Sequence, residues 1–455
     1  MLERNIKPYL YAPTTSIEQA LHDLYRRGVA ICLVCDPRRK LLGILTLSDI
    51  KRALLKGVDS HAPLKSIMIT DFTSAPSGTS LAELKKLAKI PTRFKTGILA
   101  KIPLLDKAGR VTGLYTDSKD PARASHTVLV TGGAGYMGSL VCRYLLKDGY
   151  RVVVLDKLLF SDAGIRDLYS NKNFRHIHGD TGDTRTLMEA IHDADSVIHL
   201  AGLVGDPACA LDPMQTMEEN HFGTKMLINL CQYYHVSRFI FASSCSVYGS
   251  TESRSTEESA LRPVSLYAHS KVYSEREILK TGDASFHPVI LRFGTLYGYS
   301  PRMRFDLVVN TMTARAYFDK RITVQSGEAW RPLIHADDAA RALVSALKAP
   351  LQLVSGEIFN VGSSSENYQI GTIAREVQKH LPKTTIEHQS DVKDRRDYHV
   401  SFDKIRKVLK FKTRHTLATS IGDIIKKLKT GAYDDWGSKK YSNYLTLQSQ
   451  LKKKG

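Results

Sequence analysis

The chain of 455 residues contains only six cysteines and has no long apolar run, and these absences exclude several classes of protein. Cysteines this few and this irregularly spaced cannot build the disulfide framework of a small secreted domain. Cys32 and Cys35 have CxxC spacing, but they fall in a predicted strand, where positions i and i+3 face opposite sides. No stretch approaches the about 18 apolar residues of a membrane span, and the segment MLERNIKPYLYAP lacks the apolar centre of a signal peptide. We therefore expect a cytoplasmic protein without a membrane span or a metal site.

Acidic residues are also scarce, since 46 Asp and Glu stand against 65 Lys and Arg and leave a net charge of +19. Such a charge favours anionic ligands, although it does not choose between nucleotides, nucleic acid and acidic membranes. No basic stretch is interleaved with aromatic residues, so we predict no nucleic-acid partner.

The length exceeds that of one ordinary hydrophobic core, and a composition of 42% hydrophobic and 24% charged residues is typical of a folded chain. We predict two folded parts, a linker and a basic carboxyl-terminal tail. The folded parts are residues 1–120 and 127–430, the linker is 121–126 and the tail is 431–455.

The first 120 residues contain a weak internal repeat, because DPRRKLLGILTLSD begins at Asp36 and DKAGRVTGLYTDSK begins at Asp106. In each copy a polar turn separates an apolar run from a short strand, and an amphipathic helix is predicted upstream. The repeat resembles a tandem pair of CBS domains, which are small α/β modules. The resemblance implies an adenine-nucleotide site in the first copy, formed by Thr46 and Asp49, while a packing module without a ligand is the alternative.

From Thr127 onward, apolar runs alternate with helical patterns. This alternation is typical of an α/β fold in which a doubly wound parallel sheet is covered by helices on both faces. The predicted strands are 127–130, 151–155, 174–178, 196–200, 238–242 and 288–291.

The segment TGGAGYMG follows the first of these strands and opens a helix with Gly132, Gly135 and Gly138. Glycines at a helix N-terminus let backbone N–H groups approach a pyrophosphate, and the helix dipole favours its negative charge. Asp156 ends the second strand about 20 residues farther on, where it can accept hydrogen bonds from a ribose diol and would repel a 2′-phosphate. We predict that this site binds NAD rather than NADP, although the neighbouring Lys157 opposes that preference.

The GxxGxxG spacing resembles that of the extended short-chain dehydrogenase/reductase family, and in particular its NAD-dependent nucleotide-sugar epimerases and dehydratases. Over about residues 127–430, the segments GDTGD, VIHLAG, FASSCSVYG, SLYAHSK and RPLIHADDAARA follow in the order typical of that family. The resemblance implies a Rossmann-type sheet, a homodimer, and a smaller carboxyl-terminal substrate-binding region, mainly 293–330 and 355–430. It also implies cofactor contacts from Tyr136, Met137, Asp180, Thr181, Leu200, Ala201, Gly202 and Asn220, the last of which would support the active-site lysine.

Tyr267 and Lys271 are four residues apart, so they share one face of a predicted helix. A nearby ammonium stabilises a phenolate and lowers the tyrosine pKa from about 10, which would make Tyr267 a usable base. Ser244 can hydrogen-bond the same substrate oxygen. We predict a catalytic set of Ser244, Tyr267 and Lys271, whose last two members also contact the cofactor; the alternative is an exposed helix pair.

The resemblance further places an arginine against the substrate diphosphate. Arg331 is our candidate, because a planar guanidinium fork suits phosphate oxygens. Thr295 stands in LRFGTLYG where the family usually has Asn. Ser246, Thr295 and Asn310 are the other predicted substrate contacts.

The residues that follow Ser244 distinguish the possible reactions. Related 4,6-dehydratases carry Asp-Glu there, whereas this chain has Cys245 and Ser246, neither of which is a general acid at neutral pH. The sequence therefore favours a reaction like that of UDP-glucose 4-epimerase, with reversible hydride transfer through a 4-keto sugar. A dehydratase or ketoreductase of the same family and a catalytically idle CBS/NAD sensor are the alternatives. The complete set of Ser244, Tyr267 and Lys271 argues against the sensor.

Overall fold

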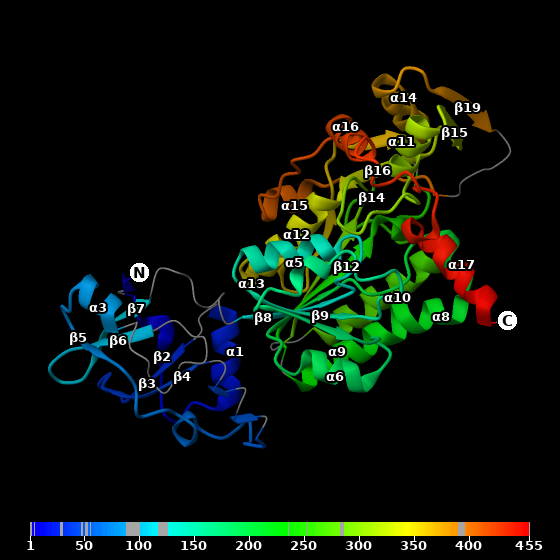
Figure 1. Ribbon diagram of the computed structural model, residues 1–455. Coiled ribbons are helices and arrows are strands. Elements are labelled where there is room, and N and C mark those ends of the chain that lie inside the picture. Colours follow the sequence, from blue (N-terminus) through cyan, green and yellow to red (C-terminus); the bar gives the residue numbers. More distant parts are fainter. Residues whose placement is uncertain are drawn as a thin grey trace.

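The computed structural model describes residues 2–454, with the exception of 4, 28–30, 47–48, 51–52, 55, 88–100, 117–125, 235, 252, 283–285 and 390–395. A smaller α/β part at the amino terminus, drawn in blue, lies beside a larger α/β part (Figure 1). The two parts touch where helix α1 (Ile17–Arg27) packs against helix α13 (Leu351–Val354).

The amino-terminal part consists of two copies of one β-α-β-β unit. In each copy the first strand pairs in parallel with the second, which pairs antiparallel with the third. The first copy contains β2 (Leu10–Tyr11), α1, β3 (Ile31–Cys35) and β4 (Leu41–Thr46), and the second contains β5 (Ala75–Pro76), α3 (Leu81–Leu87), β6 (Lys101–Leu105) and β7 (Val111–Thr116). Strand β1 (Leu2–Glu3) adds to β7, and the 3-10 turns η1 (Lys7–Tyr9) and η2 (Leu64–Ser66) complete this part.

Corresponding features of the two copies recur after 70 residues. The pairing register shifts at Val34/Cys35 in one copy and at Leu104/Leu105 in the other. The two polar turns also bond each other reciprocally, because Leu41 N donates to Gly109 O and Val111 N donates to Arg39 O, both at 3.1 Å. The repeat in sequence is therefore also a repeat in structure. As predicted for a strand, Cys32 and Cys35 face different apolar clusters.

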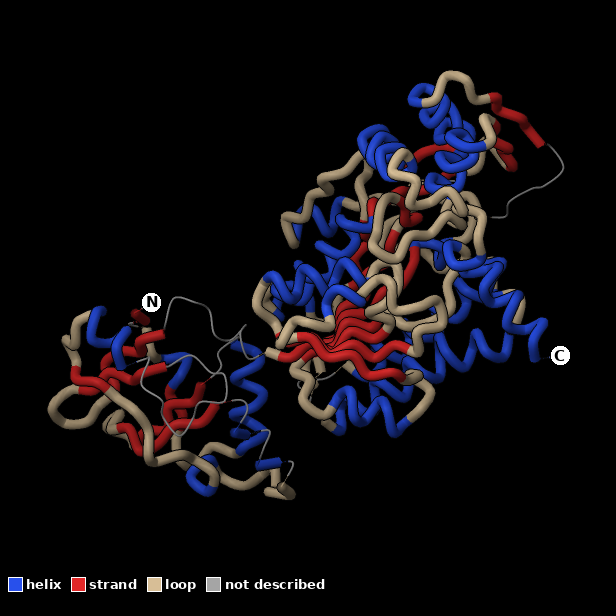
Figure 2. Tube along the Cα trace, in the orientation of Figure 1, coloured by secondary structure: helices blue, strands red, loops and turns tan. Residues whose placement is uncertain are grey.

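A seven-stranded parallel sheet forms the centre of the larger part, in the order β10-β9-β8-β11-β12-β13-β17. Strands are drawn in red in Figure 2, with helices in blue around them. Successive strands are added to one side of β8 and then, from β11 onward, to its other side. In parallel sheets, ligands bind outside the carboxyl ends of the strands at such a reversal of strand order. All six predicted strands are confirmed. Their bounds are β8 (Thr127–Thr131), β9 (Arg151–Asp156), β10 (Phe174–His178), β11 (Ser196–His199), β12 (Arg238–Ser244) and β13 (His287–Phe293). The seventh strand of the sheet, β17 (Ile358–Val361), was not predicted.

Helices cover both faces of this sheet, because its strands are apolar on both sides. In β8, Val128 and Val130 belong to one apolar cluster and Leu129 belongs to another on the opposite face. Helices α5 (Gly138–Lys147) and α12 (Ala336–Lys348) pack in the first cluster, and α6 (Thr184–Ile191), α9 (Gly223–Tyr233) and α10 (Leu266–Thr281) pack on the other side. The connections contain η3 (Arg166–Leu168), α7 (Asp206–Cys209), α8 (Pro213–Met217), η4 (Glu218–Phe222) and η5 (Cys245–Tyr248).

A separate apolar cluster holds together the region predicted to bind substrate. Its strands form two small sheets, of order β14-β16-β18 and β15-β19. The strands are β14 (Thr295–Tyr297), β15 (Arg321–Gln325), β16 (Trp330–His335), β18 (Asn367–Gln369) and β19 (Thr385–Gln389), and the helices are α11 (Val308–Phe318), α14 (Ile370–His380) and α16 (Leu417–Leu428). Helix α15 (Asp403–Val408) instead packs on β17 and in the cluster of α5 and α12.

The carboxyl-terminal segment predicted as a basic tail is described up to Lys454, and it is folded onto the larger part. It contains the 3-10 turn η6 (Lys439–Tyr441) and helix α17 (Asn443–Lys454). The buried Leu447 belongs to one small apolar cluster with Leu203 and Cys209, and the ring of Phe305 contacts several aromatic rings of the segment. Among the described residues, no helix is both long and apolar enough to span a membrane.

Candidate active site

The glycine loop between β8 and α5 brings backbone very close to backbone. Gly132 has φ of +70°, and a Cβ there would lie 2.7 Å from Ala201 N. A Cβ on Gly138 would lie 2.3 Å from Gly132 O. Both positions therefore require glycine, and the N-terminus of α5 borders a cavity of about 160 Å³.

This smaller cavity gathers nearly all of the predicted cofactor contacts, which come from the ends of four neighbouring strands. A positively polarised helix end, glycines and a carboxylate at the end of the second strand, Asp156, together fit a dinucleotide. The predicted residues along it are Gly132, Gly135, Tyr136, Met137, Gly138, Asp156, Asp180, Thr181, Leu200, Ala201 and Gly202.

Asp156 is held by the backbone around it. Its carboxylate accepts hydrogen bonds from Ala134 N at 3.0 Å and from Leu158 N at 2.8 Å, and burial raises its pKa. The adjacent Lys157 donates to Glu219 and, at 3.2 Å, to Asp180. Although burial lowers the Lys157 pKa, these two carboxylates outweigh that effect and raise it. Lys157, the cation that would recognise a 2′-phosphate, is thus already bonded to two carboxylates.

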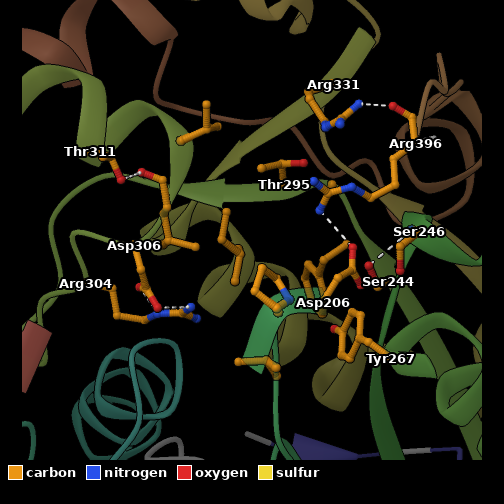
Figure 3. Close-up of a pocket in the computed structure, with 18 of the residues that line it drawn as sticks. Asp206, Ser244, Ser246, Tyr267, Thr295, Arg304, Asp306, Thr311, Arg331 and Arg396 are labelled. Atoms are coloured by element: carbon orange, nitrogen blue, oxygen red, sulfur yellow. Dashed lines mark hydrogen bonds and ion pairs between the residues drawn. The ribbon is translucent and has the colours of Figure 1, made fainter. Parts of the chain in front are cut away.

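The predicted catalytic residues meet at a second, larger cavity of about 1090 Å³, which adjoins the first (Figure 3). Ser244 ends β12 and caps the turn η5, since Ser246 N donates to Ser244 Oγ at 3.1 Å. Tyr267 and Lys271 lie on α10, as the spacing predicted. Lys271 Nζ donates to Ala242 O at 2.9 Å and lies 5.8 Å from the centroid of the Tyr267 ring.

Burial dominates the ionisation of both groups on α10. It lowers the pKa of Lys271 to about 8. It raises the pKa of Tyr267 well above the usual value, and Cys209 and Asp206 raise it further. Burial, rather than Lys271, therefore dominates the Tyr267 pKa in the protein by itself, and the expected lowering of this pKa by Lys271 stays a prediction. Tyr267 is protonated at neutral pH.

Asn220 lies in η4, a π-helical turn, and is buried away from both cavities. Its amide oxygen accepts from Leu203 N at 2.7 Å, and its amide nitrogen donates to Leu203 O at 2.9 Å and to Ser270 Oγ at 3.1 Å. Asn220 therefore ties the loop after β11 to α10, and it reaches the neighbourhood of Lys271 only through Ser270. The structure gives it a positioning role and does not bring it to the cofactor cavity.

Three of the predicted substrate contacts, Ser246, Thr295 and Arg331, lie along the larger cavity. The buried Ser246 hydroxyl has no hydrogen-bond partner within the described part of the chain. Arg331 Nη1 donates to Trp330 O at 2.7 Å and to Arg396 O at 2.5 Å, which fixes the direction of its side chain.

Asn310, the fourth predicted contact, lies behind the cavity wall. It is fully buried in α11, and its oxygen accepts from Gly298 N at 2.9 Å. Its nitrogen donates to Arg304 O at 2.8 Å and to Tyr136 Oη at 3.2 Å. Because the protein uses both ends of this amide, the assignment of Asn310 to the substrate is corrected to a structural role.

The sequence analysis missed Asp206 and Arg396, which meet on the larger cavity although they are 190 residues apart. Asp206 accepts from Arg396 Nη1 at 2.8 Å and from Ser265 Oγ at 2.6 Å. No local motif marks either residue, so only the fold reveals the pair.

Positive charge predominates along this cavity. Among the described residues that line it, five carry basic side chains and two carry carboxylates, and each carboxylate is paired with an arginine. The balance favours an anionic substrate. The basic residues are Lys271, Arg304, Arg315, Arg331 and Arg396, and the acidic residues are Asp206 and Asp306.

In the amino-terminal part, Thr46 and Asp49 bond each other. Thr46 Oγ1 and N donate to Asp49 Oδ2 at 2.5 and 2.9 Å, and Asp49 N donates to Thr46 Oγ1 at 3.3 Å. This reciprocal pattern is a helix-capping box. It supports the alternative in which this part packs without a ligand. The assignment of Thr46 and Asp49 to a nucleotide stays a prediction.

Comparisons with known proteins agree with this geometry. A family model described as the NAD dependent epimerase/dehydratase family matches residues 128–362, and a CBS domain model matches residues 6–56. The chain is 30% identical over 269 residues to a UDP-glucose 4-epimerase of Yersinia pestis, covering 52% of this chain and 77% of that protein. It is 28% identical over 284 residues to a dTDP-D-glucose 4,6-dehydratase of Mus musculus, covering 60% of this chain and 78% of that protein.

Among solved structures, a UDP-glucuronic acid 4-epimerase from Bacillus cereus, in complex with UDP-glucuronic acid and NAD, is similar to this chain with a TM-score of 0.60. The sequences are 28% identical, and the match covers 66% of this chain and 99% of the other. Relatives of the chain thus include both epimerases and dehydratases.

Proposed function

The chain belongs to the NAD dependent epimerase/dehydratase family, and on this basis we propose that it is an NAD-dependent nucleotide-sugar epimerase. The proposed reaction resembles that of UDP-glucose 4-epimerase: it inverts one carbon of the sugar through a 4-keto form and produces no net oxidation. The observation that carries the proposal is the set of groups beside Ser244, which lacks an acid able to drive the loss of water.

Cys245 and Ser246 occupy the positions where a dehydratase needs acidic groups. Cys245 is fully buried, its Sγ donates to Arg292 O at 3.3 Å, and burial raises its pKa, so it cannot exchange protons with a substrate at neutral pH. Ser246 offers only a hydroxyl to the cavity.

The two carboxylates along the larger cavity do not replace the missing acid. Asp206 is paired with Arg396, and Asp306 is paired with Arg304 at 2.8 Å. Burial opposes ionisation of Asp306, but its arginine partner outweighs burial and lowers the pKa. An ionised, paired carboxylate has no proton to give to a leaving hydroxyl, so these residues favour epimerisation over elimination.

The residues that line the smaller cavity suit NAD. The loop with Gly132 and Gly138 and the N-terminus of α5 would hold its pyrophosphate, and Asp156 would accept from a ribose diol. The engagement of Lys157 by Glu219 and Asp180 favours NAD over NADP. Bound there, NAD would supply a reversible acceptor for the hydride of the sugar.

The chain's own residues manage the proton and the charge. Tyr267 removes a proton from a sugar hydroxyl and returns it to a keto oxygen, and Ser244 can bond the same oxygen. Because burial keeps Tyr267 protonated, removal of a proton requires a positive charge close to the phenol, and Lys271 lies beside its ring. Arg331 and the other arginines of the cavity provide positive charge for a nucleoside diphosphate.

The test is product analysis. Purified chain and NAD are incubated with a panel of UDP-, GDP-, CDP- and dTDP-sugars that includes UDP-glucose, UDP-glucuronic acid and dTDP-glucose. Mass spectrometry and NMR should find a product of unchanged mass with one inverted carbon, and Tyr267→Phe should slow its formation at least about 100-fold. A product lighter by one water, or a stoichiometric yield of NADH, would contradict the proposal.

A further inference from the structure

Two side chains that no motif singled out, Arg302 and Asn443, line the smaller cavity. They are 4% and 3% exposed, respectively. Arg302 lies in the segment that follows β14, and Asn443 is the first residue of α17. The cofactor cavity is therefore bordered by the carboxyl-terminal segment as well as by the Rossmann strands.

Both residues have buried polar atoms without a hydrogen-bond partner in the part of the chain that the structure describes. These atoms are Nε and Nη2 of Arg302 and Oδ1 of Asn443. The guanidinium of Arg302 lies over the Phe160 ring, with Cζ 4.4 Å from the centroid, and a ring face supplies no acceptor lone pair. A buried cation without a partner is costly, so this arrangement indicates that an anion completes it.

Nearby carboxylates do not provide that anion, since they bond other groups. Asp156 accepts from two backbone N–H groups of its own neighbourhood. Asp306 accepts from Arg304 and, at 2.8 Å, from Asn443 N. An anion that pairs with Arg302 would therefore lie in the cavity itself.

The segment with Arg302 is bonded directly to the glycine loop. Tyr136 Oη donates to Gly298 O, and Ser300 Oγ donates to Tyr136 O, both at 2.5 Å. These bonds place the Arg302 segment beside the N-terminus of α5. The positive end of that helix and the guanidinium of Arg302 thus border one cavity, and together they favour a phosphate.

We propose that Arg302 and Asn443 form a second wall of the dinucleotide site, where Arg302 binds the pyrophosphate and the Asn443 amide oxygen accepts a hydrogen bond from a hydroxyl or amino group of the dinucleotide. This inference rests on the proposed use of NAD. It makes the carboxyl-terminal segment 431–454 part of the cofactor site.

The same wall borders the substrate cavity. Arg304 lines both cavities and is paired with Asp306, which in turn accepts from Asn443 N. Phe305 N donates to Tyr441 O at 2.9 Å and fixes the carboxyl-terminal segment to this wall.

The experiment measures the affinity of the full chain for NAD and for NADP by calorimetric titration, without turnover. Arg302→Met should weaken NAD binding about 10- to 100-fold, the usual range for loss of a charge-assisted hydrogen bond, and Arg302→Lys should restore part of it. Asn443→Ala should weaken NAD binding about 2- to 10-fold. Arg315→Met is the matched control, because Arg315 lines only the larger cavity, and it should leave NAD affinity unchanged.

Thermal unfolding without a dinucleotide separates this role from a structural one. Arg302→Met should then be at least as stable as wild type, since it removes a buried cation without a partner. If wild-type protein and Arg302→Met bind NAD equally well, the inference is overturned and the proposed function is not. The inference is also overturned if the substitution weakens only the binding of NADP, because Arg302 would then bind a 2′-phosphate. Wild-type protein that binds neither dinucleotide would overturn the proposed function and this inference together.

Discussion

The buried ammonium of Lys271 leads to a prediction in which stability and activity change in opposite directions. Burial lowers the Lys271 pKa from 10.5 to about 8, which corresponds to about 3 kcal/mol of unfavourable free energy for the charged amine in the folded protein at neutral pH. Methionine has a similar length and no charge. Loss of the bond from Nζ to Ala242 O costs about 1 kcal/mol, so Lys271→Met should raise the free energy of unfolding by about 2 kcal/mol while it abolishes turnover.

The pH dependence gives this prediction a definite sign. Because the folded pKa lies below the unfolded value, the unfolded chain binds more protons between about pH 8 and pH 10.5. The stability of the wild-type protein therefore rises with pH across that window relative to the variant, which lacks this titration. The advantage of Lys271→Met should be largest below pH 8 and should turn into a deficit of about 1 kcal/mol above pH 10.5, where only the loss of the bond to Ala242 O remains.

Urea unfolding followed by tryptophan fluorescence measures the effect in the relevant part of the chain, because both tryptophans, Trp330 and Trp436, lie in the larger part. Lys426→Met, which changes an exposed lysine on α16, is the control and should alter stability by less than about 0.5 kcal/mol. The reasoning is refuted if Lys271→Met is less stable than wild type at neutral pH, or if its advantage is the same at pH 7 and pH 10.

Three further predictions concern separate residues. Tyr267→Phe should keep NAD affinity and lower kcat by about 10²- to 10⁴-fold, and activity within a few-fold of wild type would exclude Tyr267 as the proton carrier. Wild-type protein should bind NAD more tightly than NADP in fluorescence titrations, and tighter binding of NADP would contradict the Asp156 assignment. Glu219→Gln frees Lys157 from one of its two carboxylates and should reduce the ratio of NAD affinity to NADP affinity. Asp49→Ala should lower the stability of the amino-terminal part by about 1 kcal/mol because it breaks a capping box, and adenine nucleotides that stabilise wild type but not this variant would instead support a ligand role for Asp49.

The sequence predicted those parts of the site that lie within single continuous segments. The glycine loop needs only a strand, a turn and a helix in order, and the spacing of Tyr267 and Lys271 needs only one helix. Both signals are local, so the structure reproduces them. The six predicted strands were recognisable for the same reason, because a parallel sheet buried on both faces leaves continuous apolar runs.

Features that depend on distant contacts could not be predicted in this way. Asp206 and Arg396 pair only after the chain folds, and Arg302 reaches the cofactor cavity through a segment bonded to Tyr136. The direction of the Tyr267 pKa depends on its burial, which the four-residue spacing does not reveal. The packing of helix α17 depends on distant partners too, because Leu447 and Tyr444 join a cluster with Leu203 and Cys209.

The most direct test of epimerisation follows the hydrogen that is removed from the sugar. A nucleotide sugar deuterated at C4 is incubated with the purified chain and NAD, and the product is examined by NMR and mass spectrometry. We predict a product of unchanged mass that keeps the deuterium on C4 with inverted configuration, because the same hydride leaves and returns. A product that has lost one water and no longer carries deuterium at C4 would contradict the assignment of Cys245 and Ser246 as positions unable to support elimination.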